Sequence, residues 1–68
     1  MIIVTQEILD GLEAVRQSGR TNMFDRPNVS KIARKMGHKE TSIWIDGHRK
    51  EYANGIFEGF GTEETADV

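Results

Sequence analysis

The chain has 68 residues, which allows one small domain with a modest core. It contains no cysteine, so neither a disulfide bond nor a zinc site with thiolate ligands can stabilise the fold. No apolar run approaches the roughly 20 residues that span a bilayer, and the apolar start at residues 1–4 lacks the length and the basic flank of a signal peptide. We therefore expect a soluble cytoplasmic protein with no membrane contact, stabilised by good helix packing or by homodimer formation.

The net charge is −2, but the charges are segregated along the chain. All nine Lys and Arg residues lie in the segment 16–50, which has three acids and hence a formal charge of +6. The flanking segments contain eight acids and no base. This pattern indicates either a charged face that meets an anionic partner or pairing between flanks and centre within the molecule.

The first predicted helix spans residues 6–18. Thr5 is its candidate N-cap, and Gly19 is its candidate C′ residue. Gly11 lies inside this helix, where it costs about 1 kcal/mol relative to alanine and permits close packing. The apolar residues recur at helical spacing: Ile8, Leu12 and Val15.

The stretch 21–29 contains the only proline and is typical of a helix entry. Asp25 is placed to be the N-cap, with Pro27 in the first turn. Phe24 and Val29 then occupy the two positions of a hydrophobic staple. The alternative is a recognition loop that faces a partner. We favour the capping interpretation because it explains these residues without a partner.

The second helix is predicted from about residue 26 to residue 36, with Gly37 as its stop. The segment 42–57 fits a long third helix, because apolar and aromatic residues recur on one face. A β-hairpin competes with this helix, because many residues here favour strands and Asn54-Gly55 is a strong hairpin signal.

These patterns predict an all-α fold, a small three-helix domain at residues 1–60. The alternative is a set of helices followed by a C-terminal β-hairpin. Residues 61–68 are small and acidic, and we expect them to form a disordered tail.

Several of these residues also occur together in a known family: Gly19, Thr21-Asn22-Met23-Phe24-Asp25, Val29, Ile32-Ala33, Gly37, Ile45, His48, Tyr52, Ile56 and Gly59. The pattern resembles a group of small uncharacterised proteins from Gram-positive bacteria and their phages, catalogued as a domain of unknown function. The resemblance covers roughly residues 8–59. It implies a short helical protein encoded by a phage or prophage, and it carries over no catalytic residue.

Candidate catalytic chemistry is sparse. The chain has no Gly-rich phosphate loop and no cysteine nucleophile, and His38 and His48 lack the spacing of metal ligands. His48 and Glu51 are three residues apart and could pair as a base with its orienting group, although such pairs are commoner as plain surface contacts. We expect no enzyme activity, no cofactor and no metal.

Residues 29–45 resemble a helix-turn-helix motif, because Ile32-Ala33, Gly37 and Ile43 have the required order. The second helix would begin near residue 40 and read DNA. The fit is incomplete: Trp44 falls where a polar residue is expected, and Asp46 falls where a buried aliphatic is expected. The pI of about 5.6 is also low for a DNA-binding domain.

The family resemblance leads us to expect a small non-enzymatic interaction protein that binds, and by binding inhibits, a host or defence macromolecule. The alternative is a helix-turn-helix DNA-binding regulator. A host or phage protein is the expected partner, with nucleic acid as the second candidate and a homodimer as a further one. The expected partner-binding residues are bases of the central segment and a tryptophan that is either core or interface anchor: Arg26, Lys31, Arg34, Lys35, Lys39, Trp44, Arg49 and Lys50.

Overall fold

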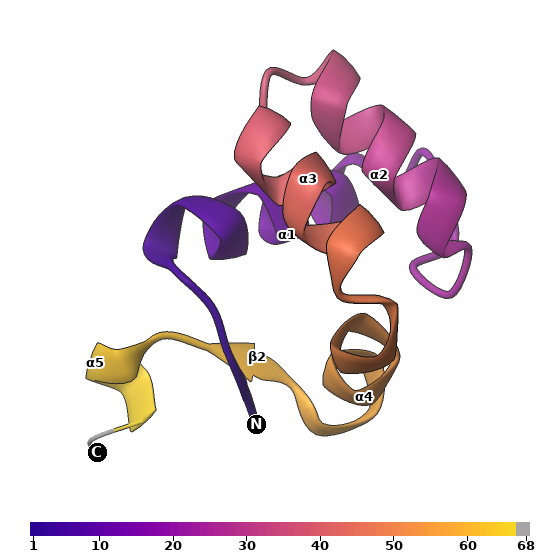
Figure 1. Cartoon of the computed structure of the whole chain (residues 1–68). Coiled ribbons are helices and arrows are strands. Elements are labelled where there is room, and N and C mark those ends of the chain that lie inside the picture. The colour runs from indigo at the N-terminus through magenta and orange to yellow at the C-terminus, as the bar shows by residue number, and fades with distance from the viewer. Residues whose placement is uncertain (67–68) are drawn as a thin grey trace.

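The computed structural model describes residues 1–66, except for the side chains of residues 65 and 66, and it is predominantly helical. The elements in chain order are β1 (Ile2–Ile3), α1 (Gln6–Ser18), α2 (Arg26–Lys35), α3 (Lys39–Gly47), α4 (Arg49–Glu58), β2 (Phe60–Gly61) and the one-turn α5 (Glu63–Ala66). Helices α1, α2 and α3 pack together, α4 lies below them, and the two short strands pair beside α4 (Figure 1). The predicted all-α class is confirmed, with one small sheet added.

Helix α1 has the ends that the sequence predicts. The Ile8 N–H donates to Thr5 Oγ1 at 3.3 Å, so Thr5 is the N-cap. Gly19 lies in the left-handed region at φ 66°, and its N–H donates to Arg16 O.

The entry into α2 differs from its prediction. Asp25 precedes the helix, but its side chain makes no capping hydrogen bond. Asn22 sets the turn instead, because its Oδ1 accepts from the Phe24 N–H at 2.9 Å. This turn directs Phe24 outward, where 66% of the residue is exposed, while Val29 is fully buried. Asp25 thus occupies the predicted N-cap position, with Pro27 in the first turn as expected, but its side chain forms no capping bond. The predicted staple between Phe24 and Val29 is wrong.

The predicted long third helix is two helices. The backbone of His48, at φ −132° and ψ 54°, ends α3 and begins α4. The hairpin alternative is wrong, because Asn54-Gly55 lies inside α4. Gly55 serves a different purpose: a Cβ at this position would collide with the ring of Phe60. The absent side chain thus lets β2 approach the helix closely.

Strands β1 and β2 pair in parallel, with Ile2 opposite Phe60 and Ile3 opposite Gly61. The Val4 N–H continues the ladder to Gly61 O at 2.8 Å. The expected disordered tail is therefore wrong for residues 61–66, which form the end of β2, the buried Thr62 and α5. Residues 67 and 68 lie outside the described part of the chain.

Helices α1 and α3 approach each other closely at Gly11. A Cβ at Gly11 would collide with Thr41 Oγ1. The hydroxyl of Thr41 is buried, and it donates toward Ile8 O at 3.2 Å and Glu7 O at 3.4 Å. This buried donor is therefore not left without a hydrogen-bond acceptor. The fully or nearly fully buried apolar residues of the core are Leu12, Val15, Val29, Ala33, Ile45 and Tyr52.

We predict that Gly11→Ala destabilises the protein by about 1–3 kcal/mol, because overpacking against Thr41 exceeds the gain of about 1 kcal/mol in helix propensity. Gly47→Ala is the matched control, since Gly47 is helical and nothing lies within 4 Å of its added Cβ. It should be neutral or stabilising. Urea unfolding of both variants measures the difference, and equal stability of the two would contradict the close α1–α3 contact.

Tyr52 ties α4 to the loop before α2 by donating from its hydroxyl to Met23 O at 2.5 Å. Burial raises the pKa of Tyr52 to about 12 from an ordinary value of 10.0, and the Arg26 charge opposes this shift. Between pH 10 and about 12 the unfolded chain loses a proton that the folded chain keeps. We predict that the free energy of unfolding is unaffected by Tyr52 below this window and falls as pH rises through it. Tyr52 is the only tyrosine, so its absorbance titration in native and denatured protein checks the shift directly.

Candidate partner-binding surface

A shallow hollow of about 550 Å³ lies between α2 and α3 and is closed by one residue of α4. Four of its lining residues are bases and one is an acid, so its formal charge is +3. We call it the basic hollow. Its lining residues are Arg26, Pro27, Ser30, Lys31, Arg34, Ser42, Asp46 and Arg49.

The period of α2 brings its bases to this place. Arg26, Ser30 and Arg34 recur at intervals of four residues and so lie on one side of the helix. Arg26 and Arg34 are about 12 Å apart along the axis, given a rise of about 1.5 Å per residue. The hollow therefore has cations toward both of its ends.

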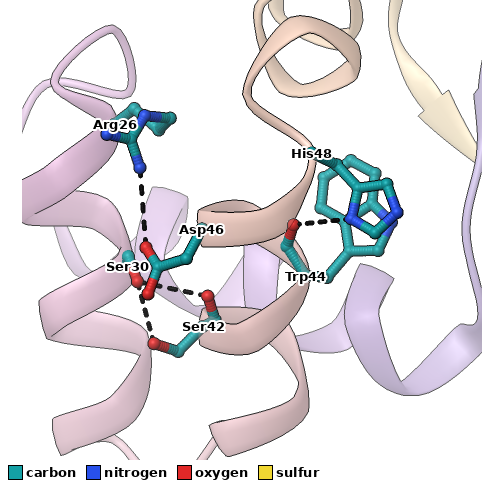
Figure 2. A network of polar contacts seen from close by, with 6 residues as sticks. All are labelled: Arg26, Ser30, Ser42, Trp44, Asp46 and His48. Atoms are coloured by element: carbon teal, nitrogen blue, oxygen red, sulfur yellow. Dashed lines mark hydrogen bonds and ion pairs between the residues drawn. The ribbon is translucent and has the colours of Figure 1, made fainter.

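The floor of the basic hollow is polar and fully bonded. Ser30 Oγ donates to Ser42 O at 3.2 Å, and the two hydroxyl oxygens are 2.8 Å apart (Figure 2). Because a hydroxyl has one proton, the second bond runs from Ser42 Oγ to Ser30 Oγ. These two bonds hold α2 against α3 and fix the width of the hollow.

One ion pair crosses the hollow. Arg26 Nη1 lies 3.5 Å from Asp46 Oδ1, and the Asp46 side chain is more than half exposed (Figure 2). The Arg26 side chain is 21% exposed, so the pair is partly exposed and long, and surface pairs contribute only about 0–1 kcal/mol. Arg26 can therefore exchange Asp46 for the carboxylate of a partner at little cost.

An exposed aromatic pair lies where the loop before α2 meets α4. The rings of Phe24 and Phe57 are 5.8 Å apart at 60°, and Phe57 is 83% exposed. Sequence reasoning placed Phe24 in the staple and did not assign Phe57 to a site. A signal existed for Phe57: it follows Ile56, so it points about 100° away from the apolar face that Ile56 shares with Tyr52.

Helix α2, a turn and α3 are present in the order that the resemblance to a helix-turn-helix requires. Gly37 does occupy the turn, at φ 90°. Ile43 is 50% exposed, whereas Ile45 is fully buried. The outward face of α3 consequently presents Lys39, Glu40, Ile43 and Asp46.

The structure brings together only half of the eight expected partner-binding residues. Of the eight, Arg26, Lys31, Arg34 and Arg49 come together around the basic hollow. Three others are exposed without lining it: Lys35, Lys39 and Lys50. Trp44 is half-buried against the core and lines a different groove.

A family model described as a domain of unknown function (DUF5049) matches residues 4–60, which is more than half of the chain. The chain belongs to the DUF5049 family. Comparison with curated proteins gave no match, and comparison with solved structures gave none either.

Within residues 1–66 of this DUF5049 domain, no helix is long and apolar enough to cross a membrane, and no group of three His, Asp or Glu side chains is arranged to hold a metal ion. The His48 ring is engaged by Trp44: the two rings are stacked 5.0 Å apart, and His48 Nδ1 lies 2.9 Å from Trp44 O. This histidine therefore orients Trp44, in place of the pairing with Glu51 considered from the sequence.

We predict that Phe24→Ser and Phe57→Ser each lower the free energy of unfolding by less than about 1.5 kcal/mol. This is the contribution that one aromatic pair makes in addition to the burial of its surface. The double variant should cost less than the sum of the two, since each single change already breaks the pair. Ile45→Ala is the buried control and should cost about 2–5 kcal/mol. A loss in Phe24→Ser as large as that in Ile45→Ala would place Phe24 in the core. Thermal or urea unfolding makes the comparison.

Proposed function

We propose that this DUF5049 domain is a small non-enzymatic interaction protein that binds an acidic surface of a host or phage protein through the basic hollow. The observation that supports this most is the gathering of Arg26, Lys31, Arg34 and Arg49 around one hollow with a single carboxylate. These bases come from helices α2 and α4. Complementary charge of this kind speeds association and selects the partner.

The aromatic pair supports a protein partner. Phe24 precedes Arg26 by two residues, and Phe57 follows Arg49 on α4 by eight residues, about 12 Å along the axis. The two segments that supply cations to the hollow thus also supply exposed rings. Aromatic and arginine side chains are the commonest residues that dominate binding energy at protein interfaces.

The resemblance to small phage proteins supports a phage or prophage origin for this domain. Binding to a host or defence protein would then inhibit that protein by covering the surface on which it acts. This mode of action needs a contact surface and no catalytic group.

A helix-turn-helix DNA-binding regulator is the second candidate, favoured by the sequence of α2, a glycine turn and α3. The outward face of α3 argues against it, because Glu40 and Asp46 would stand where DNA phosphates and bases approach. Ile43 on the same face suits contact with protein as well as with a thymine methyl group.

We predict that tagged protein captures a host or phage protein partner from lysate and that nuclease treatment does not release it. Arg34→Glu should weaken this binding about tenfold or more, because the reversed charge repels an acidic surface. Lys35→Glu is the matched control: it is the next residue on α2, exposed, but outside the hollow. It should change binding by less than about threefold.

Two results would contradict this function. The first is equal loss of binding in Arg34→Glu and Lys35→Glu, which would remove the hollow from the interface. The second is release by nuclease, together with enrichment of one motif from a random duplex library at physiological salt. If Arg34→Glu and Lys39→Glu abolish that enrichment, the DNA-binding candidate replaces the protein-binding one.

A further inference from the structure

A second groove has a volume of about 610 Å³. It forms where the two parallel strands part, since β1 leads up into α1 while β2 leads out into α5 (Figure 1). We call it the Trp44 groove. Its lining residues are Ile3, Val4, Thr5, Gln6, Ile8, Trp44, Thr62, Glu63 and Glu64. Its volume falls within the range of about 300–1,000 Å³ that is typical of ligand sites.

The apolar part of this groove is held in place before any partner arrives. The Trp44 ring is stacked on His48 at 5.0 Å and meets the edge of Phe60 at 6.0 Å and 79°. These two contacts fix the orientation of the ring. A tryptophan held in this way loses little conformational freedom on binding, which favours affinity.

Ile3 adds an accessible apolar wall. It is 43% exposed, whereas its neighbour Val4 is buried. The alternation follows from the strand, in which successive side chains point to opposite faces. Ile3 therefore offers apolar surface that the fold itself does not use.

The charge of the Trp44 groove is opposite to that of the basic hollow. Its lining contains two acids, Glu63 and Glu64, and no Lys or Arg. Both acids are exposed, and both lie in the first turn of α5. A cation that approaches the groove is attracted at this rim, and an anion is repelled.

We propose that the Trp44 groove binds a short segment of a partner protein in which one apolar side chain is flanked by lysine or arginine. The apolar side chain packs on Trp44 and Ile3, and the flanking cations pair with Glu63 and Glu64. This site is independent of the basic hollow. With both in place, the domain contacts an acidic surface through the basic hollow and a basic, apolar segment through the Trp44 groove, and so joins two partners.

The test uses the intrinsic fluorescence of Trp44, which is the only tryptophan in the chain. The probes are short peptides with blocked ends that carry Lys-Leu-Lys, Lys-Ser-Lys or Glu-Leu-Glu between glycines. We expect Lys-Leu-Lys to shift the Trp44 emission saturably, with a Kd on the order of 1 mM or tighter. Each of the other two peptides lacks one of the recognised features and should bind at least about fivefold more weakly.

Two isoleucine variants locate the binding. Ile3→Ser removes the apolar wall and should weaken Lys-Leu-Lys about fivefold or more. Ile43→Ser is the matched control, because Ile43 is 50% exposed but lies outside the groove, and it should bind as the wild type does. The paired change Glu63→Gln with Glu64→Gln should weaken binding by up to about tenfold, in keeping with exposed ion pairs. Circular dichroism checks that each variant is folded.

The proposal is overturned if Lys-Leu-Lys produces no saturable shift, if Glu-Leu-Glu binds equally well, or if Ile3→Ser and Ile43→Ser behave alike. Arg34→Glu separates this site from the proposed function. It should bind the peptide normally, because Arg34 lies outside the groove, while it loses the acidic partner.

Discussion

The contact of Gly11 with Thr41 is the constraint on which the rest of the molecule depends. It lets α1 and α3 approach without intervening side chains, and the Thr41 hydroxyl finds the carbonyl oxygens of Glu7 and Ile8 as acceptors. Once α3 is seated on α1, Ile45 enters the core and Trp44 comes beside Ile8. Both candidate sites follow from this placement, since α3 supplies Ser42 and Asp46 to one and Trp44 to the other.

Local sequence signals were sufficient to predict that these segments are helical, but not where one helix ends and the next begins. Thr5 and Gly19 mark the ends of α1 because capping depends on a few adjacent atoms. The break at His48 has no comparable signal, and the apolar period continues through it from Ile45 to Tyr52. Gly55 was ambiguous for another reason: the residue that requires it, Phe60, approaches from outside the helix.

The candidate sites were predicted in part. Segregation of charge in the sequence indicated a basic surface, and the α2 period brings half of the expected residues to the hollow. The sequence could not indicate the turn that exposes Phe24, because the spacing of Phe24 and Val29 around Asp25 favoured a hydrophobic staple, whereas Asn22 forms the turn. Nor could it indicate the groove at Trp44, which requires two strands from opposite ends of the described chain to meet.

That meeting of β1 and β2 has a consequence for the order of folding. The helices and the α2–α3 pair form from contacts between near neighbours in sequence, whereas the strands must close a loop that contains nearly all of the described chain. Such closure is entropically costly and gains only two short strands of hydrogen bonds. The strands should therefore assemble late and open first in native-state fluctuations, while the helical core stays folded. The Trp44 groove, which is built partly on the strands, therefore opens more easily than the basic hollow, which is built on α2 and α3. A ligand that binds in the Trp44 groove also favours the state in which the two strands are paired.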